Sequence, residues 1–202
     1  MVPDLGDPIP KGSPTIPAVL DPSVVASDVH RFLELLRLAR SAPREQAMAA
    51  WEAAVDLYKG DLLERADVPL WFWLYDGPTV AGGLRTEYRQ LCLGARRNLA
   101  DLYAAENGDA ELRRARELYI GLTGELAEDA RLDEQLWVAL FRTDGRRGER
   151  LGLDASVRRL RNVLAELAED GDGPDAIAIP PGLGRVIDEV RVQLSTNGRG
   201  PT

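Results

Sequence analysis

The sequence is poor in the residues that build metal sites and disulfides. Its 202 residues include one cysteine and one histidine. A single cysteine excludes an intrachain disulfide, and the two residues together cannot supply a Cys/His zinc site. A lone thiol is typical of a reducing compartment. We therefore expect a cytoplasmic protein that uses no metal and no cofactor.

Long apolar runs and an excess of basic residues are missing as well. No run approaches the roughly 18 apolar residues of a transmembrane helix, and residues 1–14 lack the pattern of a signal peptide. The chain has 33 acidic and 25 basic residues, which gives a net charge of −8. This balance argues against general binding to phosphate backbones. We expect no contact with membranes and no direct nucleic-acid binding by this chain.

Proline is concentrated at the beginning of the chain, in residues 1–26. Because proline fixes φ and lacks an amide donor, we expect an extended arm or linker there. The chain length fits one domain of ordinary size, which we place at residues 27–168. We expect an acidic loop and a C-terminal helix over 169–194, and a disordered tail over 195–202.

Between these ends, apolar residues recur with the i, i+3, i+4, i+7 spacing of amphipathic helices. No alternating strand pattern interrupts them, so the predicted fold class is all-α. Helix stop signals at Asn107-Gly108 and Asp144-Gly145 place two glycines 37 positions apart, close to the period of about 34 of a tetratricopeptide (TPR) repeat. We predict a TPR-like α-solenoid of about three helical hairpins with an added C-terminal helix. A plain helical bundle is the alternative.

Several short segments follow one another in an order that is found in a known family. They are Asp28-Val29-His30-Arg31-Phe32, Ala50-Trp51-Glu52-Ala53-Ala54 with Leu57-Tyr58-Lys59-Gly60-Asp61, Arg85-Thr86-Glu87-Tyr88 with Leu99-Ala100-Asp101-Leu102-Tyr103, and Asp133-Glu134-Gln135-Leu136-Trp137 with Gly145-Arg146-Arg147-Gly148. The series resembles the bacterial transcriptional activator domain, which is the TPR-like helical domain of the Streptomyces antibiotic regulatory protein (SARP) family and its actinobacterial relatives. The resemblance covers residues 28–168.

This resemblance implies a non-enzymatic module that takes part in transcription regulation through protein–protein interaction. Its partner would be a protein or an attached regulatory domain, and a homodimer is one option. Activators of the family carry a winged-helix DNA-binding domain before the helical part, whereas the proline-rich residues 1–26 precede it here. We therefore expect this chain to have no DNA-binding domain of its own.

A dense group of aromatic residues is the first candidate site. Aromatic side chains offer a large contact area at a low entropy cost. The group could form a loop that contacts a partner, or it could close a small-molecule-sensing pocket, which is the alternative function. The rings could equally turn inward and plug the end of the helical core. The residues are Trp71, Phe72, Trp73 and Tyr75.

Arginines near the predicted hairpin turns are the second candidate site. Arg113 and Arg114 follow the first turn, and Arg146 and Arg147 stand at the second. A further arginine cluster spans residues 158–161. Such residues could dock an acidic face of a partner, or they could form an ordinary solvated edge, because glutamates are interspersed with them.

The histidine and the cysteine do not point to catalysis. His30 falls in the first turn of a predicted helix, where we expect it to be at least partly exposed. Cys92 falls on an apolar stripe, where we expect a small buried hydrophobic side chain. Neither has a nucleophile or base nearby in the sequence, and we predict that the chain is not an enzyme.

Overall fold

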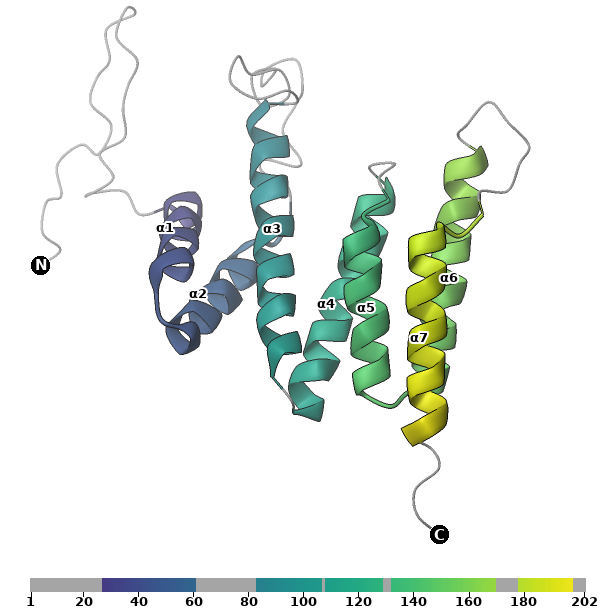
Figure 1. Cartoon of the computed structure of the whole chain (residues 1–202). Helices are drawn as coiled ribbons and strands as arrows, with labels where there is room; N and C mark the ends of the chain where they lie inside the picture. The colour runs from purple at the N-terminus through teal and green to yellow at the C-terminus, as the bar shows by residue number, and fades with distance from the viewer. Residues whose placement is uncertain (1–26, 61–82, 107, 129–131, 170–177, 198–202) are drawn as a thin grey trace, which may run out of the picture. The chain divides into compact units, whose positions relative to one another are not determined.

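The computed structural model describes residues 27–60, 83–106, 108–128, 132–169 and 178–197. Every regular element in these segments is an α-helix (Figure 1), which confirms the all-α fold class. The predicted arm (residues 1–26) and the acidic residues 170–177 lie outside these segments. Residues 1–95 and 96–202 form two compact units, and each is described by itself.

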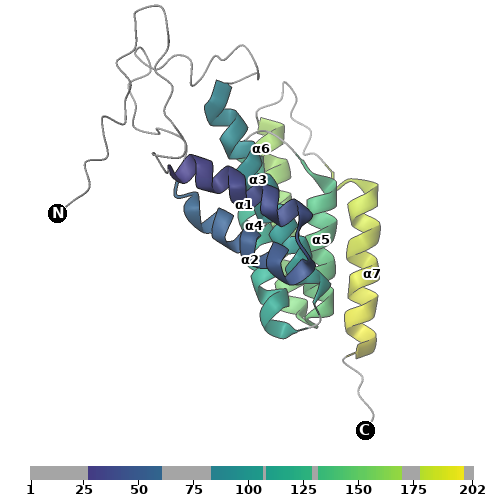
Figure 2. The same cartoon turned by 90° about the vertical axis from the view of Figure 1, so that its left-hand side faces the viewer.

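The first unit is built on a hairpin of α1 (Asp28–Ser41) and α2 (Arg44–Leu57), which is visible in Figure 2. The Ser27 side chain caps α1 by accepting a hydrogen bond from the His30 amide. The Phe32 and Tyr58 rings lie 6.1 Å apart between their centroids. The apolar face of the hairpin is buried through Phe32, Leu35, Leu36 and Ala39 of α1 and Ala47, Ala50, Trp51 and Ala54 of α2.

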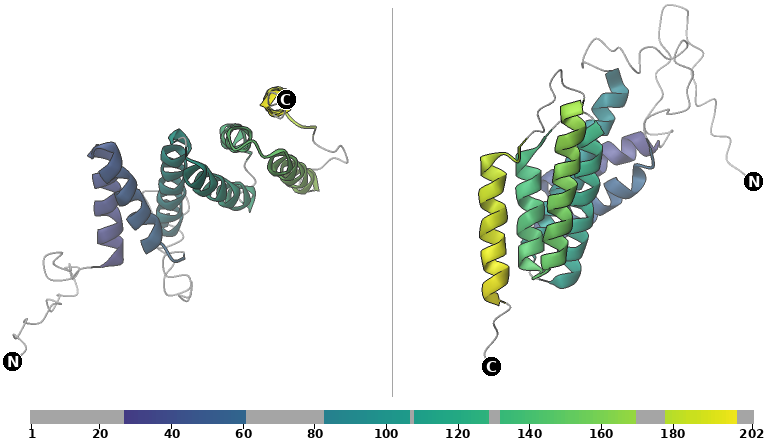
Figure 3. Two further views of the ribbon diagram at one scale, coloured as in Figure 1. Left: turned by 90° about the horizontal axis from the view of Figure 1, so that it is seen from below. Right: turned by 90° about the vertical axis from the view of Figure 1, so that its right-hand side faces the viewer.

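The second unit contains the last part of α3 (Gly83–Ala105), then α4 (Asp109–Glu128), α5 (Glu134–Arg146), α6 (Arg150–Glu169) and α7 (Pro181–Asn197). Short turns join α3 to α4 and α5 to α6. α5 packs against α4, α6 and α7, and the right-hand view of Figure 3 shows α5 next to α7. The largest side chains of this core are Tyr119, Leu122, Leu136, Trp137, Leu140, Phe141, Leu153, Leu160 and Leu183.

The turn between α5 and α6 differs from the prediction that a helix stops at Asp144-Gly145. α5 continues through both residues to Arg146, and Asp144 and Gly145 are buried. The reversal is made by Gly148, whose φ of +69° favours glycine. The prediction was wrong: Asp144 lies inside the helix, where its carboxylate accepts hydrogen bonds from Arg116 of α4 and Ser156 of α6.

The helices present one apolar face to their neighbours and a charged face away from them, which is the arrangement of amphipathic helices around a buried core. Within the segments that the structure describes, no helix combines the length and the apolar character needed to cross a bilayer.

Candidate functional site

Three of the four predicted turn arginines lie where α5 ends beside the α3–α4 turn, and two of them, Arg146 and Arg147, make contacts with other elements there. Arg146 donates through its Nη2 to the carbonyl oxygen of Glu106 at 2.7 Å and through its Nη1 to that of Ala104. These carbonyls belong to the end of α3, where helix carbonyl groups lack intrahelical partners. A guanidinium at this position also matches the negative end of the helix dipole.

Arg147 pairs with the start of α4 and with Glu149, the residue just before α6. Its side chain is only 8% exposed and lies 3.4 Å from Asp109 and 2.7 Å from Glu149, measured between nitrogen and oxygen. Arg113 holds the same Asp109 at 2.9 Å. Two guanidinium groups therefore share one carboxylate at the first turn of α4, where negative charge is favoured.

Arg114 binds the side chain of Tyr103 in two ways. Its Nη1 donates to the Tyr103 hydroxyl at 3.2 Å, and its guanidinium carbon lies 5.5 Å from the centre of the ring. The structure thus brings Arg113, Arg146 and Arg147 together near the α3–α4 turn. Arg114, the next residue of α4, points to Tyr103 instead. All four make contacts within the second unit, so part of their charge serves the fold.

Asp144 is a polar centre that the sequence reasoning missed. It is fully buried, and its two carboxylate oxygens accept hydrogen bonds from Arg116 Nε and Ser156 Oγ, each at 2.6 Å. Arg116 comes from α4 and Ser156 from α6, so one carboxylate ties three helices together. The sequence spacing could have predicted that Asp144 is buried. Leu136, Leu140 and Asp144 follow one another at intervals of four, which places them on the same face of α5.

Asp133 makes a second tie between helices. Its Oδ1 caps α5 by accepting from the Leu136 amide at 3.1 Å, while its Oδ2 lies 2.5 Å from Arg97 Nη1 of α3. Arg96, the neighbour of Arg97, pairs with Glu125 of α4. Ion pairs therefore join α3 both to α4 and to the start of α5.

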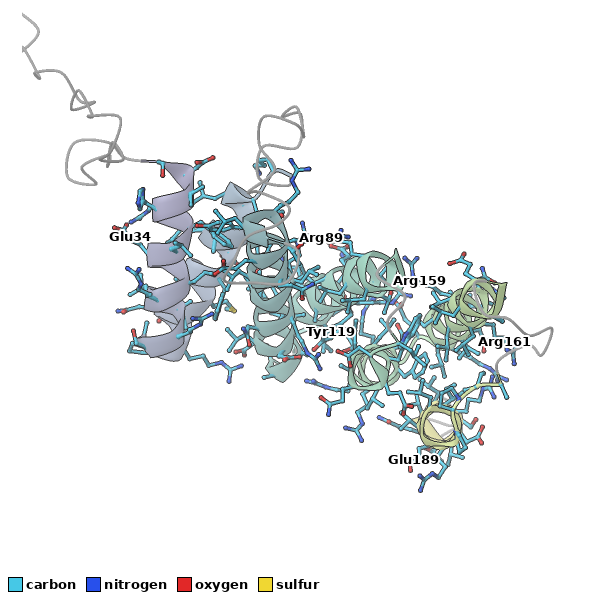
Figure 4. The ribbon with its side chains drawn as sticks, turned by 90° about the horizontal axis from the view of Figure 1, so that it is seen from above. Glu34, Arg89, Tyr119, Arg159, Arg161 and Glu189 are labelled. Atoms are coloured by element: carbon cyan, nitrogen blue, oxygen red, sulfur yellow. The ribbon has the colours of Figure 1, made fainter. Side chains whose placement is uncertain are left out.

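Tyr119 of α4, labelled in Figure 4, is almost completely buried. Its hydroxyl donates a hydrogen bond to Asp101 of α3 at 2.6 Å. Burial raises the pKa of the Tyr119 hydroxyl above its ordinary value of 10.0, and the hydrogen bond and negative charge of Asp101 raise it further. The hydroxyl is thus held as a hydrogen-bond donor and does not act as an acid or base near neutral pH.

We expect Tyr119→Phe to lower the free energy of unfolding by about 1 kcal/mol, because it removes one hydrogen bond to a carboxylate that can return to water. The raised pKa of Tyr119 stabilises the folded state fully below pH 10.0, and this stabilisation is lost as pH rises above that value. Urea denaturation at several pH values tests this, and the phenylalanine variant should lose less stability above pH 10 than the parent. Equal losses would contradict the prediction.

The remaining arginine cluster divides into two kinds of side chain. Arg159 Nε donates to Thr123 Oγ1 of α4 at 3.1 Å, so this guanidinium belongs to the α4–α6 interface. Arg158 and Arg161 are exposed. Figure 4 shows Arg159 on the side of α6 toward α4 and Arg161 on the other side of that helix.

The other predicted residues are placed as follows. His30 is exposed at the start of α1, where its Nδ1 lies 2.9 Å from the Ser27 hydroxyl. Cys92 is buried on α3, as its stripe predicts. Trp71, Phe72, Trp73 and Tyr75 lie outside the described residues, so their role stays a prediction. Among the described residues, no group of three or more His, Cys, Asp or Glu side chains could hold a metal ion.

Comparison with protein-family models, with curated proteins and with solved structures finds no match to this chain. The resemblance to the SARP helical domain consequently depends on the sequence segments quoted above, and it enters below as a proposal.

Proposed function

We propose that this chain is a non-enzymatic helical module that regulates other proteins by binding them. Its hairpins stack as a TPR-like solenoid, in the manner of the bacterial transcriptional activator domain that the sequence resembles. The partner is a protein or an attached regulatory domain of the transcription apparatus, and the chain does not bind DNA directly. The module acts in the cytoplasm.

The packing order of the second unit is the observation that carries this proposal. α4 packs on α5, α5 on α6 and α7, and α6 on α7, so helices that are close in the chain lie in contact. Repeat proteins are built in this way, with each hairpin burying its apolar face against the next. The stack leaves extended outer helix faces that can receive another macromolecule.

Hydrogen bonds and ion pairs between the helices are a further reason to expect that such a stack binds a partner protein. Two sets of contacts fix how the helices from α3 through α6 are arranged. They are Arg116–Asp144–Ser156 and Arg97–Asp133. A surface that is rigid before binding loses less conformational entropy when a partner arrives.

The experiment is chemical crosslinking of the purified full chain in an extract of its source organism, followed by mass spectrometry of the crosslinked peptides. A helical protein of equal net charge serves as the control bait. We expect reproducible crosslinks from α3–α7 to one protein or to a second copy of the chain, with a matching complex in analytical ultracentrifugation. A monomeric chain whose crosslinks equal those of the control bait would overturn the proposal.

A further inference from the structure

The outer side of α6 combines positive charge with an exposed apolar side chain. Residues 150–161 contain four arginines and one aspartate, although the whole chain has a net charge of −8. All of these arginines except Arg159 are exposed. Leu151 in the same stretch is 84% exposed, the most exposed large hydrophobic residue that the structure describes. Charge and apolar area of this kind on one surface are typical of protein-binding faces.

Helical spacing places these residues on one side of α6. Arg150, Asp154, Arg158 and Arg161 follow at intervals of three or four positions, and Leu151 lies next to this row. At a rise of about 1.5 Å per residue the row is about 16 Å long. We call the set Arg150, Leu151, Asp154, Arg158, Arg161 and Asn162 the α6 face.

The three arginines of the α6 face differ from several others in the second unit in having no carboxylate partner within the described residues. Arg97, Arg116 and Arg147 are paired with carboxylates of neighbouring helices. Arg150, Arg158 and Arg161 are exposed, and none of them has an ion-pair or hydrogen-bond partner in the part of the chain that the structure describes. Their charge is therefore available to a partner without breaking a contact of the fold.

We propose that the α6 face binds an acidic amphipathic helix of a partner protein. Carboxylates of that helix pair with Arg158 and Arg161, and an apolar residue covers Leu151. Carboxylates match guanidinium groups in charge and in geometry. This inference rests on the proposed function and adds to it the surface used and the chemistry of the partner.

A protein helix fits this face better than nucleic acid does. A phosphate backbone offers no apolar group, so it would leave the exposed Leu151 side chain uncovered. A helix bearing both carboxylates and leucines satisfies the basic and the apolar parts of the face together.

The test is a fluorescence-polarisation titration of the full chain with a labelled synthetic helical peptide of about 20 residues, with glutamate and leucine on one side. The chain is compared with Arg158→Glu/Arg161→Glu and with the matched control Arg142→Glu/Arg185→Glu, which reverses exposed arginines of α5 and α7. We expect about tenfold weaker binding for the α6 variant and less than about twofold for the control. Leu151→Ser should weaken binding several-fold.

Equal loss in the two charge-reversed variants, or no loss in the α6 variant, would overturn the inference. So would duplex DNA that binds more tightly than the peptide and depends on the same arginines. Circular dichroism checks that the variants are folded, and Arg158→Gln/Arg161→Gln replaces the charge reversal if it unfolds the chain. If the crosslinked partner of the previous section is kept by the α6 variant, this inference fails and the proposed function stands.

Discussion

Replacing Asp144 with alanine is expected to lower the free energy of unfolding of the full chain by about 3 kcal/mol. The substitution leaves the Arg116 guanidinium without its carboxylate and the buried Ser156 hydroxyl without its acceptor. Removing one member of a buried ion pair costs about 3 to 5 kcal/mol. The Arg116 side chain is 19% exposed, which places the effect at the low end of that range.

Urea denaturation followed by circular dichroism measures this effect, and Asp109→Ala is the matched control. Asp109 also pairs with two arginines, but its side chain is 64% exposed, so its loss should cost less than about 1 kcal/mol. Replacing Asp144, Arg116 and Ser156 together by apolar residues of similar size should recover much of the stability. Equal effects at Asp144 and Asp109 would show that Asp144 is not a structural centre.

Replacing Gly145 with leucine is expected to displace α7 from α5. A Cβ at this position would lie 2.8 Å from Cγ1 of Val190, which is closer than carbon atoms pack. Val190 is β-branched and buried, so it has little freedom to move away. Overpacking of this kind costs about 1 to 3 kcal/mol, and here the cost falls on the contact between α5 and α7.

Amide hydrogen exchange measures the release of α7 directly. Exchange at residues 183–194 should become faster in Gly145→Leu, while α4 keeps its protection. Gly121→Leu is the control, because a Cβ at Gly121 meets nothing within 4 Å. That control should leave α7 unchanged and stabilise α4 slightly, since leucine favours a helix more than glycine does. Unchanged exchange in the Gly145 variant would refute the close packing of the two helices.

The helices themselves could be predicted because their signal is local. Leu136 and Leu140 recur at helical spacing, and the Gly108 turn interrupts the pattern where α3 and α4 meet. A side chain three or four positions away in the sequence is a neighbour on the same helix in any fold. Fold class and most helix boundaries follow from that property alone.

The end of α5 shows why a local signal can fail. Asp144-Gly145 looks like a turn, yet Asp144 binds Arg116, which is 28 positions earlier, and Gly145 packs against Val190 of α7. Neither partner belongs to the window that defines a turn signal. A buried carboxylate with two donors is stable inside a helix, and the chain reverses at Gly148.

The sequence by itself determined that this protein is helical, acidic and poor in cysteine and histidine, and that some of its arginines form clusters. Only the tertiary structure decided which of those charges serve the fold. Arg116, Arg146 and Arg147 make contacts with residues distant in the chain, whereas Arg158 and Arg161 face outward. The reason is that periodicity depends on chain neighbours, while an ion pair depends on which helices meet.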